Sequence, residues 1–203
     1  MTQQPMVHVV DDDGAIRDAL VLLLEAAGHS ACAHPDAAAF LAALDPALPA
    51  CVVADVRMPG MSGLDLQRHL KANRIDLPVI IITGHGDVAM AVQALKEGAS
   101  DFIEKPFDED VLLASVAIAL DKGARAFNER RRLDDISARA EGLTPREREV
   151  MDLVVRGLPN KAVAVELNIS ARTVEIHRAR VMEKMAANSL SDLVRMALRL
   201  EEG

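Results

Sequence analysis

The 203-residue chain contains no tryptophan and no tyrosine, and its only aromatic side chains besides histidine are four phenylalanines. Proteins that bind single-stranded nucleic acid without sequence preference stack bases on aromatic side chains. This shortage argues against that class of protein and predicts hydrophobic cores built from aliphatic residues. Since half of the residues are apolar, the chain can form one large or two small domains.

Cysteine is also scarce, and Cys32 and Cys51 are the two copies. Both stand in apolar, strand-like runs, and no segment of signal-peptide shape precedes them, so we expect reduced cysteines in the core of a cytoplasmic protein. No apolar run approaches the roughly 20 residues that a membrane-spanning helix requires. The sequence therefore predicts no membrane partner.

Acidic residues are concentrated in the first part of the chain. Residues 1–122 carry 8 basic and 18 acidic side chains, whereas residues 123–203 carry 15 and 13. This change in composition favours two domains. The net charge of −8 does not exclude binding to nucleic acid, because charge within a Debye length of the phosphates matters most.

Strand and helix patterns alternate five times along the first domain. Apolar or β-branched runs at 7–10, 30–33, 51–56, 79–83 and 100–103 alternate with helical patterns at 15–27, 36–44, 63–73, 87–97 and from 108 onward. Gly28 and Gly98 stand where helix C-caps are expected. The pattern predicts an α/β doubly wound, flavodoxin-like fold whose parallel sheet is covered on both faces.

Polar residues stand where the predicted strands end. Asp11 and Asp12 follow the first strand, Asp55 closes the third, Thr83 closes the fourth, and Lys105 follows the fifth. Because ligands bind at the carboxyl ends of parallel strands, we expect these five side chains to form one site.

Three clustered carboxylates repel one another unless a cation joins them, and Mg²⁺ favours oxygen ligands and partners phosphate. We expect Asp12, Asp55 and the Arg57 carbonyl to bind Mg²⁺ directly, and Asp11 to bind it through water. An aspartate carboxylate can then attack phosphorus, which predicts Asp55 as a phosphoacceptor. In the product, Lys105 and the Thr83 hydroxyl would each contact a phosphate oxygen.

Each residue also has an ordinary structural interpretation. Asp13 suits a helix N-cap, Thr83 a buried strand and Lys105 a solvated surface, while His85 is more typical of an exposed loop than of catalysis. The coincidence of five residue types at four strand ends favours the functional interpretation. A metal-dependent phosphatase would also use an aspartate nucleophile, but no carboxylate stands two residues after Asp55.

The motifs VVDDD, ADVRMPGMSG, IITGHGD and DFIEKPF give residues 5–122 a resemblance to the receiver domain of bacterial response regulators, closest to the FixJ branch. The resemblance implies that Asp55 takes a phosphoryl group from a sensor histidine kinase and that the Lys105–Pro106 peptide bond is cis. It also places Phe102 at an aromatic switch position, where many receivers carry tyrosine.

The second domain, predicted at residues 143–203, has helical patterns at 145–156, 160–167 and 171–185, with Ser189 capping a fourth. Thr144 and Glu147 form a predicted capping box around Pro145. The short turn at 168–170 has the length of a helix-turn-helix corner. An apolar stripe is expected to face inward and comprises Ile169, Val174, Val181, Met182 and Met185.

The other face of the third of these helices is locally basic, as expected of a helix that enters the major groove. We predict that Glu175, Ile176, Arg178 and Ala179 face bases and that Lys161, Arg172, Thr173, Arg180 and Lys184 face the DNA backbone. A solvated, charged helix in a structural bundle is the alternative. His177 has no partners at metal-ligand spacing.

The run LTPREREVMDLVVRGLPNKAVAVELNISARTVEIHRARVMEKM resembles the four-helix LuxR-type DNA-binding domain. That resemblance implies double-stranded promoter DNA as a partner, with RNA polymerase a further partner. Residues 123–142 are predicted to prolong the last receiver helix as a linker, with Gly123 and Gly142 as hinge or break points. The arginines at 130–132 are expected to be solvated.

The family resemblance implies that the unphosphorylated receiver masks the DNA-binding domain and that phosphorylation produces a homodimer. We expect the dimer face to include Val88, Val92, Lys96 and Asp101, with Lys96 pairing with Asp101 of the partner chain. The sequence thus predicts a phosphorylation-controlled transcription factor. The alternative is a constitutive DNA-binding protein whose receiver serves only for dimerisation.

Overall fold

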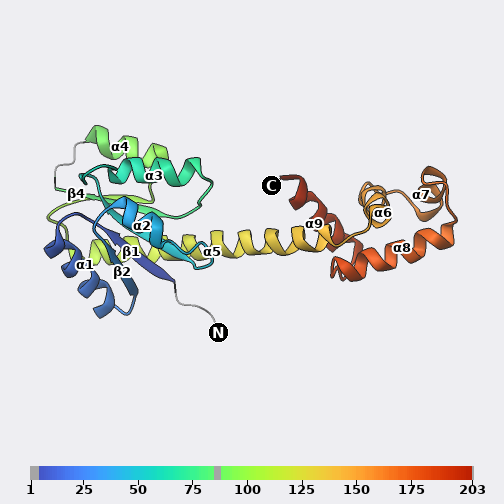
Figure 1. Ribbon diagram of the computed structural model, residues 1–203, viewed down its shortest axis with the longest axis horizontal. Coiled ribbons are helices and arrows are strands. Elements are labelled where there is room, and N and C mark those ends of the chain that lie inside the picture. Colours follow the sequence, from blue (N-terminus) through green and yellow to red (C-terminus); the bar gives the residue numbers. More distant parts are fainter. Residues whose placement is uncertain (1–4, 85–87, 203) are drawn as a thin grey trace. The chain divides into compact units, whose positions relative to one another are not determined.

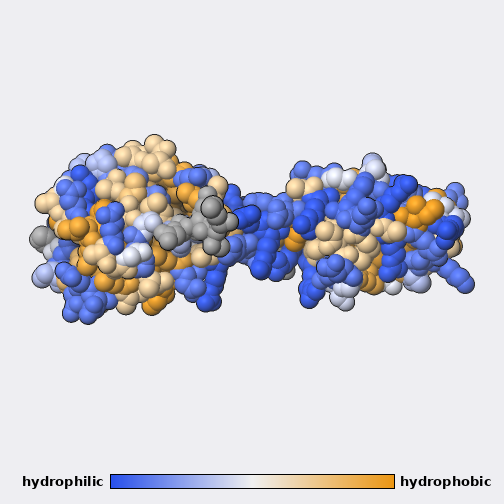
Figure 2. All heavy atoms as spheres, turned by 90° about the horizontal axis from the view of Figure 1, so that it is seen from below, coloured by the Kyte–Doolittle hydropathy of each residue, from blue (hydrophilic) through white to orange (hydrophobic). Residues whose placement is uncertain are grey.

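The computed structural model describes residues 5–84 and 88–202 (Figure 1). The chain folds into two compact units, Met1–Asn128 and Glu129–Gly203. One helix, α5 (Glu109–Glu141), has residues in both units. The predicted prolongation of the last receiver helix is therefore confirmed, and Figure 2 shows a mostly hydrophilic surface along its second half.

The first unit contains a five-stranded parallel sheet in the order β2-β1-β3-β4-β5. This confirms the predicted α/β fold, because a helix after each of the first four strands returns the chain to the sheet for the next parallel strand. The strands are β1 (Met6–Val10), β2 (Ser30–His34), β3 (Ala50–Asp55), β4 (Val79–Thr83) and β5 (Asp101–Glu104). The intervening helices are α1 (Gly14–Ala26), α2 (Ala37–Ala43), α3 (Gly63–Ala72) and α4 (Val88–Glu97).

Two hydrophobic cores lie on the two faces of this sheet. Helices α1 and α5 cover one face, with Leu24 and Leu112 fully buried between helix and sheet. Helices α2, α3 and α4 cover the other, where Phe40 and Leu66 are fully buried. Both cores are largely aliphatic, as the composition predicts, and they hold the strands so that their carboxyl ends share one edge.

The prediction that both cysteines lie in the core is wrong for Cys32. Cys51 is fully buried in the central strand β3, but Cys32 is exposed on β2. β2 is an edge strand, and its burial pattern leaves the residues at 32 and 33 open to solvent. An apolar run alone does not distinguish an edge strand from a central one.

Gly123 is not a hinge or break point. It lies inside the continuous helix α5, and a Cβ at this position would stand 2.4 Å from the Ala50 carbonyl oxygen. Its role is to let the helix approach β3 closely. Gly142, by contrast, does follow the end of α5, and its N–H donates to the carbonyls of Ala138 and Arg139 at 3.3 and 3.1 Å.

The second unit packs the end of α5 against α6 (Pro145–Val155), α7 (Asn160–Glu166), α8 (Ala171–Lys184) and α9 (Leu190–Glu202). The capping box of Thr144 and Glu147 is present. The predicted inward stripe is confirmed: Val174, Val181 and Met185 are fully buried, with the rest of the stripe partly buried beside them. Across residues 5–84 and 88–202, no helix combines the length and apolar character needed to cross a membrane.

Candidate functional site

The ammonium group of Lys105 lies between two buried carboxylates at the sheet edge. Its Nζ donates to Asp11 Oδ2 at 2.8 Å and to Asp55 Oδ1 at 2.7 Å. Asp11 follows β1, Asp55 ends β3 and Lys105 follows β5, so three strands bring these side chains together. The structure thus joins three of the five residues that the sequence predicts to form one site.

The remaining carboxylate oxygens are held by backbone donors. Asp11 Oδ1 accepts from the Asp13 N–H at 2.9 Å, and Asp55 Oδ2 accepts from the Arg57 N–H at 2.6 Å. Burial opposes the charge of Lys105, but its hydrogen bonds to Asp11 and Asp55 and their charges outweigh this effect, so its pKa is raised. The site therefore holds a charged lysine beside two fixed carboxyl groups.

Thr83 and Asp12 lie at the same edge. Thr83 is almost fully buried at the end of β4, and its carbonyl accepts from the Lys105 N–H at 2.7 Å. Asp12 is exposed next to Asp11. Hydroxyl and carboxylate groups thus lie at the ends of three adjacent strands, which is where a small ligand binds in such sheets.

The chemistry of this donor set suits a hard cation, because it consists of carboxylates and a backbone carbonyl. Within the described residues, however, the carboxylates of Asp11, Asp12 and Asp55 do not form a group of ligand atoms all within 4.8 Å of one another. Lys105 instead supplies the positive charge between two of them.

Gly63 is a site residue that the sequence reasoning missed. It begins α3, and a Cβ there would stand 2.4 Å from the Asp55 carbonyl oxygen. Only glycine lets α3 start this close to the end of β3. The sequence feature that points to it is its place at the end of the run MSG, shortly after Asp55. Glycine in a loop can also serve a tight turn or a helix cap, so this place alone does not predict a close approach of the backbone.

Three further expectations concern residues near the strand ends of the first unit. The Lys105–Pro106 peptide is cis, as the resemblance implies. Phe102, at the predicted switch position, is half-buried and packs against the core under α4. The predicted loop residue His85 lies outside the described residues.

Most of the residues predicted to face DNA lie on the exposed side of α8. The exposed members are Lys161 on α7, with Arg172, Glu175, Ile176, Ala179, Arg180 and Lys184 on α8, while Thr173 and Arg178 are half-buried. The Ser170 side chain accepts from the Thr173 N–H at 3.0 Å and thereby fixes the start of α8. The polar residues of α8 therefore share one exposed face, and its buried apolar residues face the core of the second unit.

Arg178 and Lys184, two of these residues, have partners on other elements of the second unit. Arg178 Nη1 donates to Asn160 Oδ1 at 3.0 Å, which ties α8 to the start of α7. Lys184 Nζ donates to Glu147 Oε2 at 2.7 Å and to the Gly142 carbonyl at 3.2 Å. Asn160 was expected only to mark a helix start, and its contact with Arg178 could not be found from spacing.

The predicted dimer face of α4 is exposed. Val88 and Val92 have 82% and 44% of their surface accessible, and Lys96 is exposed. Asp101, at the start of β5, is half-buried and accepts from the Phe102 N–H at 2.8 Å.

Comparison with known proteins identifies both units. Residues 7–117 match the family described as response regulator receiver domain, and residues 141–197 match that described as bacterial regulatory proteins, luxR family. Over 199 residues the chain is 49% identical to the transcriptional regulatory protein FixJ of Bradyrhizobium diazoefficiens, covering 98% of this chain and 97% of that one. The chain belongs to the FixJ family of two-component response regulators.

Other members of this family of regulators are similar over nearly the whole chain. The response regulator protein TodT of Pseudomonas putida is 41% identical over 97% of this chain and 87% of its own. The structure of the response regulator StyR superposes with a TM-score of 0.85 at 40% identity, covering 97% of this chain and all of the other. Full-length FixJ from B. japonicum is 46% identical with a TM-score of 0.56, and both chains are fully covered. This FixJ-family chain is thus a DNA-binding transcription regulator and not a classical enzyme.

Proposed function

We propose that Asp55 accepts a phosphoryl group from a sensor histidine kinase and that this modification controls the binding of the second unit to promoter DNA. The observation that supports this best is the Lys105 ammonium between Asp11 and Asp55 at the strand ends. In the transfer, a carboxylate oxygen of Asp55 forms a bond to phosphorus while the bond from phosphorus to the kinase histidine nitrogen breaks.

The other residues of the site would bind and orient the transferred group. Asp12, Asp55 and the Arg57 carbonyl would hold Mg²⁺ directly, with Asp11 acting through water. When bound, Mg²⁺ neutralises charge on the phosphoryl oxygens. Lys105 would turn from its carboxylate partners to a phosphate oxygen, and the Thr83 hydroxyl would donate to another, so the modified state gains contacts that the unmodified state does not have.

The acceptor is tested by the intact mass of the purified chain after incubation with acetyl phosphate and Mg²⁺. We expect one phosphoryl increment in the wild type and in Asp76→Asn, an exposed carboxylate away from the site, and none in Asp55→Asn. The increment should also disappear when EDTA replaces Mg²⁺. An increment that persists in Asp55→Asn would show that another residue is the acceptor.

The DNA-binding residues are proposed on the basis of the exposed face of α8. Ile176 has 45% of its surface accessible and should contact bases, so Ile176→Ala should change base preference. Arg180 should contact phosphate, so Arg180→Ala should weaken binding about equally for all sequences and lower the salt slope by about 1. Equal effects of the two variants on specificity would contradict this division.

The activated form is proposed to be a homodimer in which Lys96 pairs with Asp101 of the partner chain. The exposed Val88 and Val92 support this face. Lys96→Asp should abolish the dimerisation that phosphorylation induces, and adding Asp101→Lys should restore it. We expect the dimer to act in the cytoplasm on paired DNA half-sites and to recruit RNA polymerase for activation.

The rival hypothesis is a constitutive DNA-binding regulator whose receiver only dimerises. It predicts equal promoter affinity for the wild type and Asp55→Asn under phosphorylating conditions. The proposed switch predicts tighter binding by the wild type alone, because a modification shifts an equilibrium only if it favours one state. A binding titration on both proteins separates the two hypotheses.

A further inference from the structure

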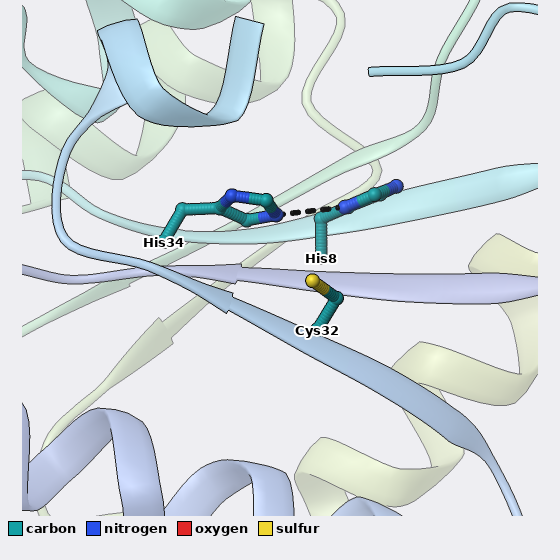
Figure 3. Close-up of side chains that lie close together, drawn as sticks. All are labelled: His8, Cys32 and His34. Atoms are coloured by element: carbon teal, nitrogen blue, oxygen red, sulfur yellow. Dashed lines mark hydrogen bonds between the residues drawn. The ribbon is translucent and has the colours of Figure 1, made fainter. Parts of the chain in front are cut away.

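A group of potential metal ligands lies on β1 and β2, away from the aspartate site. His8 and Cys32 are register partners in the two parallel strands, and His34 follows Cys32 by two residues, so all three side chains stand on the same face of the sheet (Figure 3). In the part of the chain that the structure describes, this is the one group of three such residues whose ligand atoms all lie within 4.8 Å of one another.

The two imidazole rings already face each other through their nitrogens. His8 Nδ1 and His34 Nε2 are 2.9 Å apart and share one hydrogen bond. Both rings are more than nine-tenths buried and pack edge-on against Phe40, with centroids 5.2 and 5.5 Å from its ring. Their positions are therefore fixed by strand pairing and by packing, and Cys32, on the same strand as His34, has its Sγ on the side of the two rings.

Burial, together with the charge of His34, lowers the pKa of His8 to about 4, and burial also lowers the pKa of His34. Both rings are consequently neutral at pH 7, which is the form that binds metals. The aspartate site offers only hard oxygen atoms, whereas this cluster offers two nitrogens and a sulfur. The two sites thus differ in the class of cation that they favour.

We propose that His8, Cys32 and His34 form a binding site for a borderline transition metal, with Zn²⁺ as the occupant. Imidazole and thiolate are the ligands that Zn²⁺ prefers, at about 2.0–2.1 Å for nitrogen and 2.3 Å for sulfur. In a tetrahedral site these bond lengths put neighbouring donors roughly 3.3–3.6 Å apart. Donors that already lie within 4.8 Å of one another reach that spacing by side-chain adjustment on a fixed backbone.

Three protein ligands leave the fourth position of a tetrahedral metal open. The exposed position of Cys32 gives that fourth position access to water, and it gives the metal a route into the site. Binding would replace the His8–His34 hydrogen bond by two metal–nitrogen bonds and would release the thiol proton of Cys32 to solvent. The proton that the two rings share in their hydrogen bond would move by exchange with solvent to the outer nitrogen of the ring that carries it, so that the bound imidazoles are protonated at His8 Nε2 and His34 Nδ1.

The site is tested with the untagged full-length chain and Co²⁺ as a spectroscopic probe, followed by displacement with Zn²⁺. Excess Mg²⁺ is present throughout so that the aspartate site is not a competitor. We expect one Co²⁺ per chain, with visible bands of tetrahedral intensity and a thiolate-to-metal charge-transfer band in the near ultraviolet. Failure to bind Co²⁺, or binding of Co²⁺ without the charge-transfer band, would overturn the proposal.

Matched variants assign the ligands. Cys32→Ser should remove the charge-transfer band. It should also weaken Zn²⁺ binding at least about 10-fold, since loss of a residue that only hydrogen-bonds to a metal ligand already lowers metal affinity by that factor. His69→Gln, which removes an exposed histidine on α3, should leave both unchanged. Equal Zn²⁺ affinity in the wild type and Cys32→Ser would mean that the thiol is no ligand.

A second readout covers the buried histidines, whose variants could fail to fold. Zn²⁺ should slow the alkylation of Cys32 by a maleimide in the wild type, because a thiolate bound to the metal is no longer a free nucleophile; intact mass measures the rate. His34→Gln, if its helical circular dichroism is retained, should lose this protection. If the variant does not fold, protection in the wild type decides alone, and unprotected Cys32 at saturating Zn²⁺ would refute the site.

Discussion

At the scale of single residues, Lys105 explains how two carboxylates can lie close together at the sheet edge. Two carboxylates that are nearly buried would repel each other and would each bear the cost of lost hydration. Lys105 bonds to both at 2.7–2.8 Å, and its own side chain is 17% exposed. One lysine therefore stabilises both carboxylates, and under the proposed function the same ammonium group would bind the phosphoryl group.

Replacing Lys105 by methionine should expose this dual role. Lys105→Met leaves Asp11 and Asp55 without their common partner, and we expect a loss of about 1–3 kcal/mol in the unfolding free energy of the first unit. Because Mg²⁺ can replace the missing charge, it should stabilise the variant more than the wild type. Urea unfolding with and without Mg²⁺ measures both effects. In the Lys105→Met, Asp55→Asn double variant much of the loss should be recovered; no recovery would point to lost packing instead.

Glu147 carries a pH dependence of the second unit. Its hydrogen bond from Lys184, followed by that from the Thr144 N–H, lowers its pKa to about 2 from an ordinary 4.5. A carboxyl group with a lowered pKa in the folded state stabilises above its unfolded pKa, and this contribution is lost as pH falls from about 4.5 through 2.

The advantage of the wild type over Glu147→Gln in unfolding free energy should therefore be full at pH 6 and shrink as pH falls toward 2. Guanidinium unfolding followed by helical circular dichroism at several pH values measures it. A difference that stays constant over this range would mean that the ion pair with Lys184 does not set the pKa. Asp152→Asn, which removes an exposed carboxyl group on α6, is the matched control.

At the scale of elements, the close approach of α5 to β3 depends on Gly123. Alanine favours a helix by about 1 kcal/mol over glycine, but its Cβ would stand 2.4 Å from the Ala50 carbonyl oxygen. Overpacking costs about 1–3 kcal/mol, so the clash should win, and Gly123→Ala should destabilise the first unit.

The same substitution at Gly14, at the start of α1, meets only a flexible arginine side chain at 3.5 Å. Thermal unfolding of both variants and the wild type measures the two effects, and Gly14→Ala should be neutral or slightly stabilising. Were Gly123→Ala also neutral, α5 would be free to shift on the sheet, and Gly123 would not be a packing requirement.

The elements that sequence predicted well are those with strong local signals. The five strands of the first unit, the glycine caps at Gly28 and Gly98, with φ of 86° and 108°, and the capping box at Thr144 all follow from short-range patterns. Convergence of Asp11, Asp55 and Lys105 follows from strand-end topology. What could not be predicted depends on distance in space: the exposed edge at Cys32, and the close approaches of Gly63 and Gly123.

The side-chain contacts within each site could not be predicted from the sequence for the same reason. That Lys105 bridges two carboxylates, or that Arg178 donates to Asn160, depends on rotamers and on atoms 18 or more residues apart. His8 and His34 stand 26 residues apart, and only the pairing of β1 with β2 brings their rings together. Residue types and order therefore predict a site, while its electrostatics require the packed structure.

At the scale of the whole molecule, the two units have separate hydrophobic cores. The first unit has one core on each face of its sheet, and the second has its own core around Val150, Val174 and Met185. Each unit also has its own charged network, one around Lys105 and one around Glu147. Independent cores predict independent unfolding, because cooperativity requires shared buried surface.

Differential scanning calorimetry of the intact chain should therefore resolve two transitions, which intrinsic fluorescence cannot follow since tryptophan and tyrosine are absent. Lys105→Met should lower only the transition of the first unit, and Glu147→Gln only that of the second. Hydrogen exchange, read by peptide mass, assigns each transition to its unit. A single transition that both variants lower equally would show that α5, which has residues in both units, couples them into one cooperative structure. For the proposed switch, a single transition would favour transmission of the change at Asp55 through α5 to the second unit. Two independent transitions would instead favour a switch that acts through dimerisation or through release of a masked surface.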